Sequence, residues 1–392
     1  MQRDKDVNCK IKLDAKKGVF SKLVIFVLSL VFALSAAFVF GGCSVCRYCI
    51  DDSECEFCAI RNYTTVELFD NFSPSVVEIN AGSQKGTGFV VRNLGSSVYI
   101  ATNHHVIEDF ILDNSVGINI QFVNKALAFS DDEVLLVGYD EYFDIAVLKV
   151  TSPSSNSLAT FEGIRQINQI HANPVIGAQL FALGNMDGVG IAAFSGMVSL
   201  TDRILDFGTS TPLSLRFRPT IQVCVNLNQG TSGGPVLDMS GRLVGIAAFQ
   251  SPKDSDGRPQ VGVSFIMPAC IVMALVDNAI ENPTGTAIER FAVRLESANR
   301  ISMIGLGGLV LERESDGNFT ISSIGTQPTN TTGSWLSTGD TIENISSLRI
   351  RNNAVSFTEI ISTLLLYIVQ TTGDRLTIRT TQDSITFNNL RR

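Results

Sequence analysis

Three short segments of this chain carry side chains whose types suit nucleophilic catalysis. Residues 98–109 hold an apolar run that ends at two adjacent histidines, His104 and His105, and an imidazole is the usual general base near neutral pH. Asp144 begins a second apolar run. A carboxylate at the edge of a core is costly unless it pairs, and orienting an imidazole is one use for it.

The third segment supplies a candidate nucleophile. Ser232 lies within the run GTSGGP at residues 230–235, where glycines on both sides allow a tight turn that exposes the hydroxyl and aims N–H groups at one point. A lone histidine or aspartate is more often structural than catalytic, and a glycine-rich turn can lack chemistry. The order His, Asp, Ser along one chain nevertheless favours a catalytic triad.

Composition and charge restrict the class of protein. The chain has 392 residues, of which 45% are hydrophobic, enough for more than one packed core. A basic segment at residues 1–22 precedes an acidic remainder, and the net charge is -8. Because phosphate binding needs clustered Lys and Arg, this balance excludes a nucleic-acid partner. The catalytic segments imply no cofactor and no metal.

An uncharged apolar run covers residues 23–40. As a helix it would be about 27 Å long, close to the hydrocarbon thickness of a bilayer. The basic residues before it predict a cytoplasmic N-terminus and an extracytoplasmic remainder. We expect an uncleaved transmembrane anchor in the cell membrane. The alternative is a cleaved signal, because Gly41-Gly42-Cys43 is similar to the end of a lipoprotein signal, which would anchor the chain at Cys43.

Residues 41–63 form a Cys-rich linker. It contains five of the eight cysteines of the chain: Cys43, Cys46, Cys49, Cys55 and Cys58. An extracytoplasmic location favours disulfides or a lipid on Cys43. Zinc held by two Cys-x-x-Cys pairs is an alternative, and so are free thiols without a role.

The pattern of residues 64–280 predicts a mainly β unit. A short helix at 64–73 precedes strands at 75–80, 88–92, 98–102, 116–122, 133–139, 145–150, 179–183 and 243–249, as in a sandwich or barrel. A helix after Pro268 closes this unit, and residues 281–287 read as a linker. Residues 288–383 predict a small α+β module, in which Ser356 and Glu359 form a capping box before an amphipathic helix. Strands at 341–345 and 375–380 flank that helix.

The motifs resemble the HtrA/Deg family of chymotrypsin-like serine proteases. SPSVVEI, GTGFVV, TNHHV, DIAVLKV, ALGN, SGMVS and GVSFIMP follow the family's order within residues 67–276. The resemblance implies a chymotrypsin-like double β-barrel of two six-stranded units, with His105, Asp144 and Ser232 as its triad. It also implies an oxyanion hole formed by the N–H groups of Gly230 and Ser232. His104 is then a bystander, and His171 is expected to be a surface or loop residue.

The same pattern suggests a specificity pocket. It implies that Asn226 forms the base of the S1 pocket and that Ala248 and Phe249 line its wall. A buried cation would lack a counter-charge there, so we expect cleavage after small or medium apolar side chains. Three residues depart from the family pattern: Cys224, Gln229 and Thr231. We expect them to affect the shape of the activation loops in the resting protein.

The module at 288–383 resembles a PDZ domain, on the strength of LSTGDTI at residues 336–342, the capped helix and the RLTIRT strand. PDZ domains bind a C-terminal peptide as an added strand. The resemblance assigns the carboxylate loop to Phe291, Ala292 and Val293, with residues 305–307 as the alternative.

The expected protein is a membrane-tethered serine endopeptidase that degrades unfolded or mislocalised extracytoplasmic proteins. Its expected partners are unfolded protein or peptide substrates, C-terminal peptides and the membrane, and the resemblance implies a homotrimer. Two rival hypotheses are a catalytically silent chaperone or peptide-binding scaffold on the same fold, and a zinc-dependent redox protein built on the Cys-x-x-Cys pairs.

Overall fold

The computed structural model describes residues 62–388, except 114, 153–160, 209–210, 212, 251–261, 288–292, 304–305, 330, 347, 351–354 and 370–374. The predicted basic segment, membrane anchor and cysteine cluster therefore lie outside the described residues. Within the described part of the chain, no helix is both long and apolar enough to cross a membrane.

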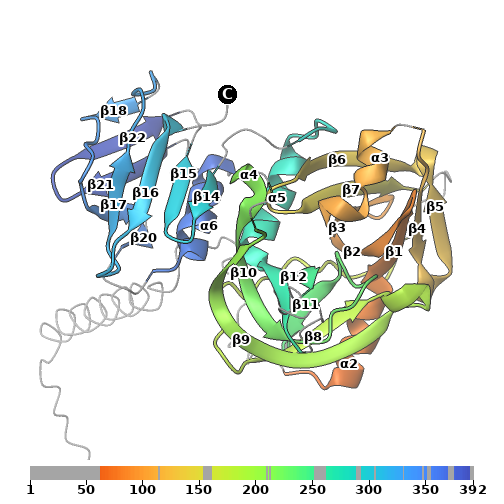
Figure 1. Ribbon diagram of the computed structural model, residues 1–392. Helices are drawn as coiled ribbons and strands as arrows, with labels where there is room; N and C mark the ends of the chain where they lie inside the picture. The colour runs from red at the N-terminus through yellow and green to blue at the C-terminus, as the bar shows by residue number, and fades with distance from the viewer. Residues whose placement is uncertain are drawn as a thin grey trace, which may run out of the picture. The chain divides into compact units, whose positions relative to one another are not determined.

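Seven antiparallel strands form the first sheet, in the order β5-β4-β1-β2-β3-β7-β6 (Figure 1). They are β1 (Val76–Ala81), β2 (Gln84–Asn93), β3 (Ser97–Thr102), β4 (Ile118–Phe122), β5 (Leu127–Ser130), β6 (Val134–Asp140) and β7 (Ile145–Thr151). Apolar side chains from several of these strands, including Ile79, Ile100 and Leu148, are fully buried in one core. The sheet has one strand more than the resemblance implies, because the chain reverses at Ala126 (φ 52) and β5 pairs with β4.

A ten-stranded sheet begins with the order β13-β12-β11-β8-β9-β10, and β13 also pairs with β10, so these six strands close into a barrel. They are β8 (Gln179–Gly184), β9 (Ala192–Asp206), β10 (Phe217–Cys224), β11 (Pro235–Asp238), β12 (Leu243–Gln250) and β13 (Ser264–Pro268). The closed ring agrees with the second barrel that the resemblance implies. The eight strands predicted from the pattern are all present, with ends that differ by a few residues.

Two of the helices beside these strands were expected from the sequence. In α2 (Thr65–Phe72), Thr64 Oγ1 accepts the Glu67 N–H at 3.2 Å, and the Glu67 carboxylate accepts the Thr64 N–H at 2.8 Å. This capping box satisfies two donors of the first turn. The helix α5 (Ala269–Glu281) follows Pro268 and buries Ile271 and Leu275. The short helices α3 (Glu108–Leu112) and α4 (Leu213–Arg216) were not predicted.

The predicted linker after α5 lies along β6. The N–H groups of Thr284 and Gly285 both donate to the Val137 carbonyl, at 3.2 and 3.0 Å. Ala287 then forms an isolated bridge with Tyr139. Backbone hydrogen bonds therefore hold this segment against the first sheet.

The C-terminal part continues the ten-stranded sheet, since Phe217 of β10 pairs with Leu295 of β14. The added strands are β14 (Val293–Ser297), β15 (Arg300–Met303), β16 (Leu309–Arg313) and β17 (Phe319–Ser323). A third sheet has the order β18-β22-β21-β19-β20 and comprises β18 (Thr331–Gly333), β19 (Ile342–Ile345), β20 (Leu348–Arg349), β21 (Arg375–Thr380) and β22 (Ser384–Asn388).

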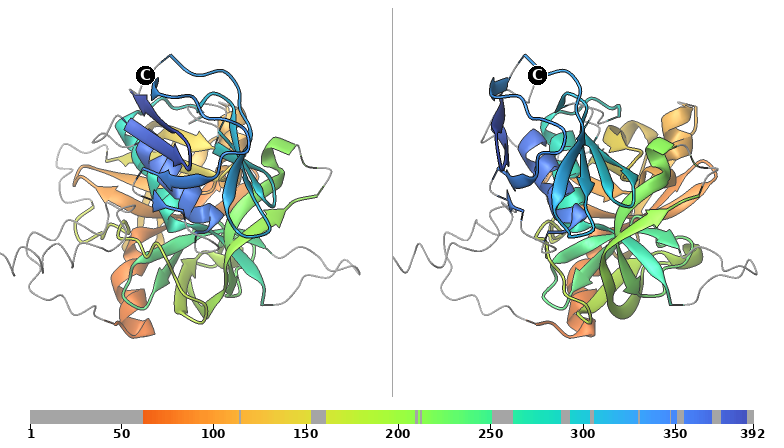
Figure 2. Two further views of the ribbon diagram at one scale, coloured as in Figure 1. Left: turned by 90° about the vertical axis from the view of Figure 1, so that its left-hand side faces the viewer. Right: turned by 60° about the vertical axis from the view of Figure 1, so that its left-hand side comes forward.

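The helix α6 (Phe357–Val369) packs against both β14 and the third sheet (Figure 2). The capping box predicted before it is present. Ser356 Oγ accepts the Glu359 N–H at 3.0 Å, and the Glu359 carboxylate accepts the Ser356 N–H at 2.8 Å. The sequence therefore predicted this helix and two of its flanking strands correctly.

Candidate active site

The pairing of β3 with β7 brings the candidate base and acid together. Thr102, at the end of β3, pairs with Ala146 near the start of β7. The chain then turns through η3 (His104–Val106), while Asp144 directly precedes β7. As a result, His105 Nδ1 lies 2.7 Å from Asp144 Oδ2, although the residues are 39 positions apart.

The Asp144 carboxylate is fixed by more than this one contact. Its Oδ1 accepts the His105 backbone N–H at 3.0 Å, and its backbone carbonyl accepts the side-chain amide of Asn103 at 2.8 Å. Asp144 is buried and adopts a left-handed conformation with φ 56. Such a backbone is strained for a residue with a side chain, so the surrounding bonds must hold it.

Opposing effects act on the pKa of His105. Burial lowers the pKa, but the charge of Asp144 and its hydrogen bond raise it, and the net pKa lies above the ordinary value. The side chain is still 42% exposed, so a substrate could reach it. An imidazolium formed at this position would be stabilised by Asp144, as a general base requires.

The adjacent histidine has a different environment. His104 is buried, and its ring lies 5.1 Å from the Tyr139 ring, centroid to centroid. Burial lowers the pKa of His104. It therefore resembles a neutral core histidine, which supports the interpretation that His105 is the base.

The loop that carries Ser232 is held by its own backbone. Gly230 and Gly233 adopt φ 90 and φ 85, which only glycine reaches without strain. The Thr231 N–H donates to Asn228 O at 3.0 Å, and the Gly234 N–H donates to Thr231 O at 2.9 Å. The Thr231 hydroxyl also donates to Asn228 O, at 2.6 Å. The threonine that departs from the family thus closes the same turn.

Gly86 on β2 lets the serine loop approach the histidine segment. A Cβ on Gly86 would lie 2.5 Å from a methyl carbon of Val106, and 3.0 Å from the Ser232 carbonyl oxygen. Only glycine therefore allows the residue after His105 and the candidate nucleophile to meet at this point. Among the described residues, no hydrogen bond joins the Ser232 hydroxyl to His105, and such bonds often tighten only when substrate binds.

Two backbone donors face no protein acceptor in this loop. Among the residues that the structure describes, the N–H groups of Gly230 and Ser232 make no hydrogen bond. The peptides beside them are fixed, because Thr87 Oγ1 donates to Gly230 O at 2.7 Å and the Gly233 N–H donates to Ala247 O at 2.8 Å. These two free donors could stabilise an oxyanion.

The remaining predicted site residues are only partly described. Asn226 is exposed and Ala248 is buried on β12, whose neighbouring residue Ala247 bonds the serine loop. The side chain of Phe249 lies outside the described residues, so the S1 pocket stays a prediction. Phe291 and Ala292 also lie outside them.

Val293 begins β14, is buried and pairs with Met303. The assignment of a carboxylate loop to residues 291–293 therefore also stays a prediction. Within the described part of the chain, no group of three His, Cys, Asp or Glu side chains is arranged to hold a metal.

A second His–Asp pair was not expected from the sequence. His171 Nδ1 lies 2.9 Å from Asp238 Oδ2, and its side chain is 26% exposed. Arg242 donates to the same carboxylate oxygen at 2.8 Å. No motif surrounds His171, so neither its spacing nor its neighbours could have revealed the contact.

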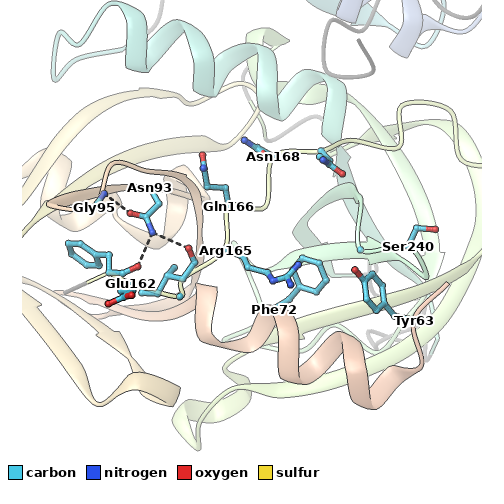
Figure 3. A pocket seen from close by; sticks show the side chains of 14 residues that line it. Tyr63, Phe72, Asn93, Gly95, Glu162, Arg165, Gln166, Asn168 and Ser240 are labelled. Atoms are coloured by element: carbon cyan, nitrogen blue, oxygen red, sulfur yellow. Dashed lines mark hydrogen bonds between the residues drawn. The ribbon is translucent and has the colours of Figure 1, made fainter. Parts of the chain in front are cut away.

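A pocket of about 860 Å³ has a lining that includes none of His105, Asp144 and Ser232, and Figure 3 shows its lining side chains. Its wall includes Tyr63, Phe72, Asn93 and Arg165. The Asn93 amide donates to Phe161 O at 2.9 Å and to Ile164 O at 3.0 Å, and the Arg165 guanidinium lies over the Phe72 ring. The polar side chains of Gln166, Asn168 and Gln169 also line this pocket.

Comparison with known proteins identifies related sequences. A model of the trypsin-like peptidase domain matches residues 86–246. The chloroplastic Protease Do-like 1 of Arabidopsis thaliana is 28% identical over 289 residues, 73% of this chain and 59% of that protein. The serine protease Do-like HtrA of Lactococcus lactis subsp. cremoris is 26% identical over 310 residues, 75% of this chain and 71% of that protein.

A probable periplasmic serine endoprotease, DegP-like, of Bartonella henselae is 31% identical over 202 residues, 50% of this chain and 33% of that protein. The chain thus spans between one third and seven tenths of the length of these relatives. The matched peptidase segment contains His105, Asp144 and Ser232.

Proposed function

Because this chain belongs to the HtrA/Deg family of trypsin-like serine proteases, we propose that it is a serine endopeptidase with His105, Asp144 and Ser232 as its triad. The observation that carries the proposal is the 2.7 Å contact between His105 Nδ1 and buried Asp144. The glycine-rich loop of Ser232 meets the same segment through Gly86.

In the proposed reaction, Ser232 Oγ attacks the carbonyl carbon of a peptide bond while His105 Nε2 takes the hydroxyl proton. Asp144 orients the imidazole and stabilises the imidazolium. The N–H groups of Gly230 and Ser232 bind the oxyanion. His105 then gives the proton to the leaving amine, which breaks the peptide bond and leaves an acyl-enzyme. A water molecule, deprotonated by His105, releases the acid and regenerates Ser232.

The proposed substrates are unfolded or mislocalised proteins outside the cytoplasm, cleaved after small or medium apolar side chains. Asn226, Ala248 and Phe249 would form the S1 pocket. The missing acidic residue at position 226 supports this preference, because a buried Arg or Lys side chain would find no counter-charge. A peptide library scored for the residue before the cleaved bond tests it.

The proposed location is the cell membrane, with residues 23–40 as a single anchor and the peptidase outside. The apolar run and the basic segment before it support this topology. The relative from Bartonella henselae is named as probably periplasmic, which is consistent with it. Attachment through a lipid on Cys43 is the alternative, and mass spectrometry of the N-terminus separates the two.

Residues 64–280 would form the protease domain and residues 288–383 a PDZ-like domain that binds C-terminal peptides. The capped helix α6 and the strands beside it support the second assignment. A peptide with a free C-terminus should bind, whereas its amidated form should not. The proposed homotrimer is tested by the mass of the detergent-solubilised full chain.

The proposed activity is tested by casein digestion with the detergent-solubilised full chain beside its Ser232→Ala variant. We expect cleavage by the first and none by the second. Equal cleavage by both would remove Ser232 from the mechanism. Cleavage by neither, even with C-terminal peptides present, would favour the silent scaffold.

A further inference from the structure

Thr87 on β2 joins three elements around the candidate oxyanion hole. It is fully buried, and each of its polar atoms is bonded. Its N–H donates to Ser232 O at 2.8 Å, and its carbonyl accepts the Thr102 hydroxyl at 2.7 Å. The backbone of Thr87 therefore links the serine loop to the strand that leads to His105.

The Thr87 hydroxyl makes two further contacts. It donates to Gly230 O at 2.7 Å and accepts the Asn185 N–H at 2.9 Å. A hydroxyl has one proton, and Gly230 O can only accept, so the direction of both bonds is fixed. Because threonine is β-branched, few rotamers are open to its side chain.

The bond to Gly230 O controls one peptide group of the loop. The carbonyl of the Gly230–Thr231 peptide is held by Thr87, and its N–H is held by Asn228 O at 3.0 Å. The free N–H groups of Gly230 and Ser232 lie on either side of this peptide. It could not rotate without breaking both bonds, and a rotation would redirect the donors.

The serine loop also packs closely against Thr87. A Cβ on Gly233 would collide with the Thr87 carbonyl oxygen and with the Thr102 hydroxyl. Contact this close means that a shift of Thr87 would be transmitted directly to the loop.

We propose that the Thr87 hydroxyl is a positioning group for the oxyanion hole: it fixes the Gly230 carbonyl so that the two free N–H groups converge on the substrate carbonyl. Thr87 touches no reacting atom. The inference rests on the proposed peptidase function.

The test compares the full chain with Thr87→Val, Thr87→Ser and a matched control, Thr220→Val. Thr220 is equally buried, and its hydroxyl donates to Arg203 O at 2.8 Å. We expect Thr87→Val to lower kcat for a chromogenic peptide about 10- to 100-fold. This decrease is no larger than the one that follows removal of a single oxyanion donor. KM should stay within about two-fold, and the acid midpoint of kcat/KM should not move, because the His105–Asp144 bond is untouched.

Thr87→Ser keeps the hydroxyl and should retain kcat within about three-fold, as should Thr220→Val. The proposal is overturned if Thr87→Val keeps the kcat of the control, if Thr87→Ser is as slow as Thr87→Val, or if only KM changes. If Thr87→Val does not fold, Thr87→Ala replaces it, and equal kcat for the Ala and Ser variants overturns the proposal. Loss of cleavage by the unmodified chain would instead reject the peptidase function itself.

Discussion

Two His–Asp pairs in this molecule have nearly the same length but different surroundings. His105 lies 2.7 Å from Asp144, and His171 lies 2.9 Å from Asp238. Asp144 gives both carboxylate oxygens to His105, one to the ring and one to the backbone N–H. Asp238 shares its oxygens among His171, the Arg242 side chain and two backbone N–H groups.

The serines beside the two pairs also differ. Ser232 lies in a loop where two N–H groups, those of Gly230 and Ser232, make no hydrogen bond with any residue that the structure describes. Ser240 follows Asp238, but its hydroxyl donates to the side-chain oxygen of Asn62 at 3.2 Å. A short His–Asp contact is therefore insufficient as a sign of catalysis. In the proposed mechanism, a serine nucleophile and N–H donors for an oxyanion are needed as well.

Removing each imidazole should separate the pairs most strongly. His105→Ala should lower kcat by about six orders of magnitude, because Ser232 loses its base. His171→Ala should stay within about three-fold. The rates of peptide hydrolysis by the two variants measure this difference, and equal losses would mean that His171 also serves the reaction.

Changing each carboxylate to an amide should give a smaller contrast. Asp144→Asn should lower kcat by about four orders of magnitude, because the imidazole is held in the wrong tautomer. Asp238→Asn should leave kcat nearly unchanged. It should lower the free energy of unfolding by about 1–3 kcal/mol, because buried bonds to His171 and Arg242 are lost. Thermal melts beside the kinetic assay separate the two effects.

The pH dependence of activity should follow His105. Only the neutral imidazole accepts the Ser232 proton, so kcat/KM should fall as the pH drops through the pKa of His105, which Asp144 raises above 6.5. The same interaction stabilises the folded protein below the unfolded pKa and is lost as the pH rises through the folded pKa. His171→Ala should leave the acid midpoint of kcat/KM unchanged. A midpoint that shifts in this variant would contradict the assignment of His105 as the base.

The smallest effect is expected at Arg242. Arg242→Met should lower the free energy of unfolding by less than about 1 kcal/mol, because the guanidinium is partly exposed and its charge is screened by solvent. The Arg242→Met variant keeps the contact between His171 and Asp238 but adds no nucleophile loop to that pair. The double variant Arg242→Met, Ser232→Ala should therefore cleave no peptide, and any cleavage would show that the second pair can be catalytic.

The features that the sequence revealed are local or carried by motifs. Ser356 and Glu359 cap a helix three residues apart, and the segments with His105 and Asp144 each begin or end an apolar strand. The contact of His171 with Asp238 joins residues 67 positions apart, without any motif at either end. The contact of Thr87 was also hidden, although both residues lie in motifs, because its partner Gly230 is 143 positions away.

Some differences come from strand boundaries. The strand β9 (Ala192–Asp206) was not among the predicted strands, because apolar and polar residues do not alternate along its sequence, although exposed and less exposed positions largely alternate in the structure. The extra strand β5 is short and follows a turn at Ala126, a residue that seldom adopts a left-handed conformation. Long-range pairing decided both elements, and local propensity does not report it.

The most direct measurement of the central claim is labelling with a fluorophosphonate, followed by peptide mapping of the full chain. If the His105–Asp144 pair alone activates a serine, the label should appear on Ser232, persist in His171→Ala and disappear in His105→Ala. Label on Ser240, or on Ser232 with equal yield after His105→Ala, would contradict the account.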